Sequence, residues 1–379
     1  MTTGPLRGVR VVEIAGIGPG PHAAMLLADL GADVIRVERP GGPALSAGPR
    51  ETDLLTRGRP SVALDLKHPD AVATVLALAE KADVLLEGMR PGAAERLGLG
   101  PDDLLARNPR LVYGRMTGWG QDGPWAEVAG HDMNYLAVSG VLHGLGQVPE
   151  RPQFPTNLLG DFGGGSTYLV IGVLAALLEA RTSGQGQVVD AAIVDGAAHL
   201  GAMFAGMLAG GVAHERRASG VLDGGAPFYD LYSTSDGRHL SVGALEPQFY
   251  AELVRLLELD DAPDQWDLAR WGELRERLTT RFAERTQAEW VEVFDGTDAC
   301  VAPVLPVSEA AQHPHLAARG TWVDRDGVTQ PAPAPRFSRT PASLGAGPSV
   351  VGGDTRAALT AWGIPDVDAL LASGAAVQA

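Results

Sequence analysis

Short apolar segments alternate with helical ones through the first third of the chain, and this alternation constrains the fold most. RVVEIAG (10–16) has the length of a strand, PHAAMLLADLGA (21–32) has helical spacing, and DVIRVERP (33–40) is strand-like again. The pattern continues with a strand at 61–66, a helix at 70–82 and strands at 83–88 and 111–118. Strands that alternate with helices of about 10 to 13 residues predict an α/β fold, with a mostly parallel sheet covered by helices on both faces.

The remainder of the chain predicts a second, smaller domain. After Pro155 a long helical region is expected at about 161–181, and the apolar segment 188–208 resumes it. A chain of 379 residues exceeds one ordinary core, so two domains are expected. We predict a large α/β domain at 1–200 and 331–379, a linker at 201–226, a small α+β domain at 227–315 and a second linker at 316–330.

The charge of the chain argues against a nucleic acid partner. The net charge is −16 at pH 7, whereas binding to a polyphosphate needs a basic face. Residues 1–120 hold 14 basic and 14 acidic residues, so the rest of the chain carries the whole negative charge. An anionic small molecule is therefore best received in the first third.

Cysteine usage and apolar patterning indicate a soluble, cytoplasmic protein. The single cysteine, Cys300, allows neither a disulfide framework nor a cysteine-rich metal site, and we expect it to be a small buried hydrophobe. The stretch 168–178 is too short to span a bilayer, and 196–213 is rich in alanine and glycine. We interpret 196–213 as a packed core or subunit-interface helix, and no signal peptide is visible.

A glycine pattern typical of dinucleotide binding follows the first predicted strand. GPGPHA (18–23) fits G-x-G-x-x-[GA], and Glu38 ends the next strand. Pro19 and Pro21, however, lack the N–H groups with which such a loop holds a pyrophosphate. A nicotinamide-dependent enzyme therefore stays the weaker alternative to a rigid loop that leads into a helix.

Basic residues recur near the predicted strand ends, where ligands of open α/β sheets bind. They are Arg39, Arg57, Arg59, Lys67, Arg90, Arg96 and Arg115. Any one of them alone is more often a solvated surface group. As a set they favour a multiply phosphorylated, nucleotide-bearing ligand, because guanidinium groups hold phosphates and stack on purines.

Three isolated residues could carry acid–base chemistry or merely structure. His131 follows Gly130 in a loop that opens a predicted helix, and a lone histidine is usually structural. Asp161, in GDFGGGS, is either a helix N-cap or a carboxylate beside a ligand that glycines allow to approach. Glu246 has the same ambiguity, and spacing alone leaves all three open.

Seven segments, in order, resemble the family III CoA-transferases. They are RVVEIAGIGPGPHAAMLLADLGADVIRVERP, LLEGMRPGAAERLGLG, LVYGRMTGWGQDGPW, AGHDMNYLAVSGVL, NLLGDFGGGS, RTSGQGQVVDAAIVDG and TDACVAPVL, and the similarity runs from about residue 5 to about residue 340. Within the family they are most similar to its racemase branch, which acts on 2-methylacyl-CoA thioesters. The resemblance implies a CoA-binding large domain, an interlocked ring-like homodimer with the active site between subunits, and no cofactor apart from the CoA of the substrate.

The resemblance also implies roles for the three isolated residues. His131 and Asp161 match the family's two bases, one on each face of the substrate's α-carbon, and such bases need pKa values near the working pH. Glu246 matches an acid that orients the histidine, contributed by the other subunit. A backbone N–H near the GDFGGG turn is expected to stabilise the enolate oxygen.

For CoA, the similarity points to two groups of residues. The first group comprises Arg39, Leu64, Asp65, Leu66, Lys67, Arg90 and Arg96. The second comprises Gly130, Asp132, Met133, Asn134 and Tyr135. Gly88 and Met89 stand where the family often has an asparagine and an aromatic residue, so the adenine contact differs here.

Two other functions stay open. In a CoA-transferase, Asp161 would attack the thioester and form a mixed anhydride, with CoA as the leaving group. His131 favours the racemase, because a transferase has no need of that base. A CoA-binding or scaffolding dimer without turnover would require a degenerate site, whereas both acid–base residues are present.

Overall fold

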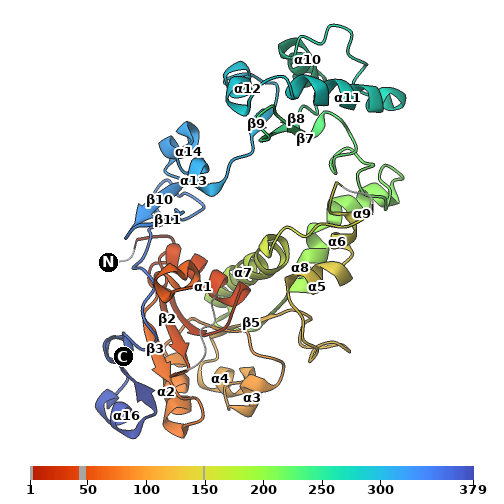
Figure 1. The fold of residues 1–379 in the computed structure, drawn as a ribbon. Coiled ribbons are helices and arrows are strands. Elements are labelled where there is room, and N and C mark those ends of the chain that lie inside the picture. Colours follow the sequence, from red (N-terminus) through yellow and green to blue (C-terminus); the bar gives the residue numbers. More distant parts are fainter. Residues whose placement is uncertain (1–2, 42–47, 148–149) are drawn as a thin grey trace. The chain divides into compact units, whose positions relative to one another are not determined.

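The computed structural model describes residues 3–41, 48–147 and 150–379, which fall into two compact units (Figure 1). The first unit comprises Met1–Ser139, Pro155–Leu200 and Ala317–Ala379, and the second comprises Gly140–Phe154 and Gly201–Leu316. Both ends of the chain thus belong to one unit. Residues 140–154, which were predicted to belong to the large domain, group with the second unit. Residues 317–330, which were predicted to be a linker, group with the first unit.

A seven-stranded sheet forms the centre of the first unit, in the order β12-β3-β2-β1-β4-β5-β6. The strands are β1 Arg10–Ile14, β2 Asp33–Glu38, β3 Ser61–Leu64, β4 Val84–Glu87, β5 Val112–Thr117, β6 Val188–Ala192 and β12 Ala376–Val377. Every pairing is parallel except that of β12 with β3. The predicted α/β fold with a mostly parallel sheet is confirmed.

The two faces of this sheet bury separate cores, because successive strand residues point to opposite sides. On one face Val12 packs in a cluster with α2 (Pro69–Ala79) and α15 (Thr355–Ala361). On the other face Val11 packs in a cluster with α1 (Pro19–Asp29) and α7 (Thr167–Ser183). Helices therefore cover both faces, as predicted.

The helical region expected at about 161–181 is confirmed, and the helix expected at 188–208 was wrong at its start. Residues Leu158–Ser166 form a π-helix, η3, and α7 starts only after it. The segment 188–208 begins with the strand β6 and then continues as α8 (Ile193–Leu200) and α9 (Ala202–Ala209). The β-branched pair Val188 and Val189 favours a strand, and pairing with β5 supplies its hydrogen bonds.

The second unit contains a small antiparallel sheet of β7 (Tyr229–Ser233), β8 (His239–Gly243) and β9 (Val301–Pro303). It packs with α10 (Pro247–Leu256), α11 (Trp271–Phe282) and α12 (Gln287–Phe294) around an aromatic core. The remaining helices are α3 Ala93–Arg96, α4 Pro101–Arg107, α5 Asp132–Val138, α6 Val141–Gly144, α13 Val307–Ala310, α14 Pro314–Arg319 and α16 Val367–Ser373, and the 3-10 turns are η1 Arg50–Thr52, η2 Leu54–Thr56 and η4 Leu268–Arg270. The strands β10 Trp322–Arg325 and β11 Val328–Pro331 form a hairpin in the first unit.

Together η3 and α7 make a continuous helical stretch, Leu158–Ser183, of 26 residues. By length and composition alone it could cross a membrane, whereas the apolar run 168–178 within it is by itself too short. In its most apolar window of 18 residues, a share of 39% is buried. The same helical stretch also contains Asp161.

Candidate active site

A cavity of about 490 Å³ lies at the carboxyl ends of the central strands. The chain runs outward from β1 through β2 to β3, then returns to place β4 on the other side of β1. The neighbours β1 and β4 thus form the topological switch point, where open α/β sheets bind ligands. The loops after β1, β4 and β5 line the cavity, and both His131 and Asp161 border it.

Asp161 is held in the first half of the π-helix, a rare form that is frequently found at functional sites. Asn157, one turn earlier, donates from Nδ2 to Asp161 Oδ2 at 3.3 Å. A Cβ atom added to Gly18, in the loop after β1, would lie 3.1 Å from the same oxygen. The carboxylate is therefore closely flanked by the chain on two sides.

The environment of Asp161 raises its pKa. Burial is the largest cause, and the negative charge of Asp132 acts in the same direction. The hydrogen bond from Asn157 and the positive charge of a protonated His131 lower the pKa. A carboxyl group shifted upward in this way is better suited to exchange protons near neutral pH.

The glycines after Asp161 make room for protein rather than for a ligand. A Cβ atom on Gly164 would lie 2.6 Å from the backbone nitrogen of Ala197, in α8. Gly196 has no room for a Cβ either, because the carbonyl of Gly164 occupies that space. Close contact between η3 and α8 thus explains this part of the glycine run.

The far half of the π-helix is fixed by α1. Ser166 is fully buried, and its hydroxyl donates to the carbonyl of Phe162 at 3.0 Å. Nδ1 of His22 lies 2.6 Å from the same hydroxyl, and the His22 ring packs on Phe162. Burial lowers the pKa of His22 to about 4, so its ring is neutral at physiological pH.

His131 is exposed at the N-cap of α5, beside the cavity. Its backbone N–H donates to Oδ1 of Asn134 at 3.0 Å, an arrangement that fixes the start of the helix. Tyr135 is buried, donates its hydroxyl to the Gly130 carbonyl and packs edge-on against Trp119, with ring centroids 4.8 Å apart. The loop that carries His131 is therefore well anchored.

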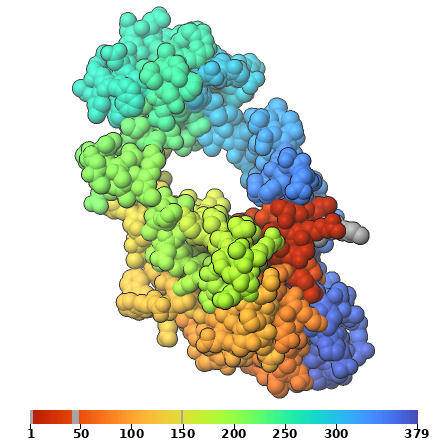
Figure 2. Space-filling view, turned by 180° about the vertical axis from the view of Figure 1, so that it is seen from behind, coloured from red at the N-terminus to blue at the C-terminus, as the bar shows by residue number. Residues whose placement is uncertain are grey.

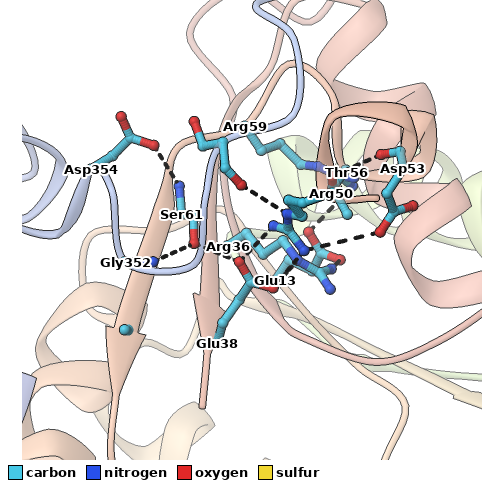
Figure 3. Close-up of polar contacts among 12 residues, drawn as sticks. Glu13, Arg36, Glu38, Arg50, Asp53, Thr56, Arg59, Ser61, Gly352 and Asp354 are labelled. Atoms are coloured by element: carbon cyan, nitrogen blue, oxygen red, sulfur yellow. Dashed lines mark hydrogen bonds and ion pairs between the residues drawn. The ribbon is translucent and has the colours of Figure 1, made fainter. Parts of the chain in front are cut away.

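Three of the seven basic residues are occupied by buried ion pairs. Arg57 bonds Asp29 at 2.6 Å, Arg59 lies 3.2 Å from Glu13, and Arg115 bonds Glu87 at 2.9 Å. Figure 3 shows Arg59 within a network with Glu13, Arg36, Glu38 and Arg50, which also includes Ser61 and the C-terminal residues Gly352 and Asp354. Carboxylates of the chain itself therefore hold these three guanidinium groups, so the interpretation of the whole set as phosphate ligands was too broad.

Three of the remaining basic residues are free to meet an anion. Arg39, Lys67 and Arg90 are exposed, and within residues 3–41, 48–147 and 150–379 their side chains make no ion pair. Arg90 lines the cavity. Arg96, also exposed, ends α3 and interacts electrostatically with Glu95.

The other residues predicted to bind CoA are distributed unevenly. Gly130 and Tyr135 line the cavity, and Met133 and Asn134 are exposed on α5. Leu64 is buried in β3 opposite Ala376, and Asp65 and Leu66 follow it with partial exposure. Asp132 is buried, and its carboxylate accepts the backbone N–H of Asp161 at 2.6 Å.

Glu246 belongs to the second unit, at the N-cap of α10. Burial, and next the charge of Glu246, raise the pKa of Cys300. Cys300 is exposed and has a positive φ of 53°, so the expectation of a buried thiol was wrong. It lines a cavity of about 480 Å³ within the second unit, together with Tyr229 and Asp230.

Several residues that line the cavity were not among the predicted site residues, and Gly18, Asn157 and Trp119 are three of them. Asn157 could have been found, because it stands four positions before Asp161 and thus one helical turn away. Gly18 and Trp119 come together only in the folded sheet. They follow β1 and β5, which run in the same direction with β4 between them, so both residues lie at the same edge of the sheet. Among the described residues there is no group of three or more His, Cys, Asp or Glu side chains that could hold a metal ion.

Comparison with known proteins identifies the family. Residues 6–355 match CoA-transferase family III. The chain belongs to this family. It is 48% identical over 340 residues to the alpha-methylacyl-CoA racemase of Mus musculus, an alignment that covers 89% of this chain and 87% of that protein. The Homo sapiens alpha-methylacyl-CoA racemase is 44% identical over 340 residues, with the same two coverages.

Solved structures of the family share the fold. A CAIB/BAIF family protein from Brucella suis superposes with a TM-score of 0.82 at 27% identity, over 95% of this chain and 100% of that one. The large parallel sheet and the small antiparallel sheet are therefore features of the family, and the resemblance seen in the sequence is confirmed.

Proposed function

We propose that the chain is a racemase that interconverts (2R)- and (2S)-2-methylacyl-CoA thioesters. The observation that carries the proposal is that His131 and Asp161, separated by thirty positions in sequence, border one cavity at the switch point of the sheet. The similarity to two alpha-methylacyl-CoA racemases over most of the chain supports the same reaction.

The reaction needs two bases because the α-carbon must lose a proton on one face and gain one on the other. The thioester carbonyl takes up the charge of the lost proton as an enolate. One of the two bases takes the proton; the carboxylate does so in its ionised form and the imidazole in its neutral form. The other base starts protonated and returns a proton from the opposite side. The raised pKa of Asp161 brings its proton affinity closer to that of an imidazole, which favours a reversible exchange.

The CoA part of the substrate would meet the exposed basic residues of the first unit. Arg39, Lys67 and Arg90 follow β2, β3 and β4, at the same edge of the sheet as the cavity. Their charges can pair with the phosphates of CoA, and Arg96 adds a fourth cation nearby in sequence. CoA enters as part of the substrate, so the mechanism requires no further cofactor.

The enolate oxygen needs a hydrogen-bond donor, and two backbone N–H groups near the GDFGGG turn are already hydrogen-bonded within the protein. The backbone N–H of Asp161 donates to Asp132, and the N–H of Gly160 interacts with the same carboxylate. Neither group is free for the substrate. The donor should therefore be sought elsewhere along the rim of the cavity, rather than at the start of the GDFGGG turn.

We further propose that the enzyme is a homodimer with interlocked subunits. On α7, Ile171, Ala175 and Leu178 are exposed at spacings of four and three, which form one stripe of the helix. The yellow-green segment that contains α7 lies at the surface in Figure 2. A second copy would cover this stripe. With the subunits interlocked as the family resemblance implies, Glu246 of the partner subunit would lie near His131.

The first test is deuterium exchange. Pure enzyme is incubated in D₂O with one epimer of a 2-methylacyl-CoA, and NMR follows α-deuterium and the epimer ratio. Deuterium uptake with drift towards both epimers supports the racemase. Transfer of CoA to an added carboxylic acid without α-exchange would assign a transferase, with Asp161 as the nucleophile. Binding without either reaction would indicate a CoA-binding scaffold.

A further inference from the structure

The carboxylate of Asp132 is buried, although the preceding residue, His131, lines the cavity. The residue is 6% exposed, and its Oδ1 accepts the N–H of Asp161 at 2.6 Å. The N–H of Gly160 also interacts with this carboxylate. A Cβ atom on Gly160 would lie 2.8 Å from Cγ of Asp132, so the close approach depends on glycine.

These contacts satisfy N–H groups that a helix leaves open at its start. The first turn of any helix has amide groups without intrahelical acceptors, and a carboxylate is a strong acceptor for them. Here the acceptor comes from a distant segment, because Asp132 is the first residue of α5 and Asp161 lies in η3. The side chain thus ties two separate elements of the first unit together.

The position of Asp132 in the chain gives this tie a functional meaning. Asp132 directly follows His131, while its side chain holds the backbone of Asp161. Two bases that act on opposite faces of one carbon must keep a fixed separation, and misplacement by about 1 Å can cost on the order of 100-fold in rate. One residue therefore connects the main chain of both bases.

We propose that Asp132 is a positioning residue that fixes the separation of His131 and Asp161. The proposal rests on the racemase function and replaces the earlier interpretation of Asp132 as a CoA-binding residue. Asp132 acts through Asp161 and does not itself touch the reacting carbon.

The charge of Asp132 adds an electrostatic effect that a purely structural contact would not have. Asp161 faces Asp132 and His131, and Tyr135 lies close enough for the charge of Asp161 to affect it. On its other side, the chain packs through Phe162 against His22, whose ring is neutral. Removal of the Asp132 charge lowers the pKa of Asp161, since that charge disfavours the ionised carboxylate.

The test compares Asp132→Asn with Asp132→Ala in the full-length enzyme. The asparagine keeps an oxygen acceptor for the N–H groups, whereas alanine removes it. We expect kcat of Asp132→Asn to stay within about fivefold of the wild type, and kcat of Asp132→Ala to fall about 100-fold with little change in KM. Asp102→Asn, an exposed aspartate on α4, is the matched control and should behave as the wild type.

The pH profile separates positioning from a loss of folding. In Asp132→Asn, the acid limb of the direction that uses Asp161 as the base should move to lower pH. The alkaline limb of the reverse direction should move the same way, because Asp161 must then start protonated. A variant that only lowers the thermal midpoint, with an unchanged profile and an unchanged kcat per folded enzyme, would overturn the proposal.

Failure of the inference can be told apart from failure of the proposed function. If Asp132→Ala raises KM for the CoA ester at constant kcat, Asp132 is a ligand-binding residue and the positioning role is wrong, although the enzyme is still a racemase. If the wild type transfers CoA without α-exchange, the racemase function is wrong. The same two variants then test whether Asp132 positions Asp161 as a nucleophile, by the rate of anhydride formation.

Discussion

Replacing Asp161 by asparagine should separate proton exchange from racemisation. With one base missing, the epimer whose α-proton faces His131 can still lose it and regain deuterium on the same face. The other epimer has no base on its reactive side. Asp161→Asn should therefore incorporate deuterium into one epimer with retention and produce almost none of the opposite epimer. His131→Ala should show the mirror-image result.

The size of the effect follows from what a general base contributes. Loss of one base should reduce racemisation by about 100- to 10,000-fold, which corresponds to about 2.7 to 5.4 kcal/mol of activation free energy. His131 is exposed, so its proton equilibrates with solvent and the retained exchange should be readily visible. Asp161 is partly buried and its pKa is raised, so exchange through Asp161 should set in only at a pH above the ordinary range of an aspartate.

The assay is proton NMR in D₂O, started separately from each pure epimer, with chiral analysis of the hydrolysed acid. Asp102→Asn serves as the control for a change from carboxylate to amide away from the cavity. Racemisation by Asp161→Asn within tenfold of the wild type, or exchange in both epimers at equal rates, would refute the two-base reasoning.

Three further predictions concern stability and assembly. Arg59→Met should lower the free energy of unfolding, measured by urea denaturation, by about 3 kcal/mol. This is the lower end for a broken buried ion pair, because Arg36 still faces Glu13. The control Arg107→Met removes an exposed ion pair and should cost less than about 1 kcal/mol, so equal effects of the two variants would contradict the prediction. Ile171→Asp should yield monomers in analytical ultracentrifugation, whereas Val307→Asp should not; an unchanged dimer would place the interface elsewhere. Gly164→Ala should lower the thermal midpoint and slow α-exchange, since its Cβ meets the backbone of α8, and wild-type values of both would show that η3 can shift without consequence.

The alternating strands and helices of the first third were predictable because each element is specified locally. A strand such as Val84–Leu86 is buried on both faces and therefore appears as a continuous apolar run. The π-helix was not predictable, because its glycines suit many conformations and contacts with α8, α1 and Asp132 hold this one. The strand β12 has two residues and exists through its pairing with β3.

The sequence by itself determined the fold class and, through its resemblance to a family, the pair of residues proposed to act on the substrate. Only the tertiary structure decided which charged residues are available for that work. In the sequence, Arg59 and Arg90 are both arginines near predicted strand ends and cannot be distinguished. In the structure, Arg59 is buried beside Glu13, whereas Arg90 is exposed and lines the cavity. Asp132 likewise turned inward to hold Asp161. Burial and partners decide the role of a charge, and both arise from residues that are distant in the chain.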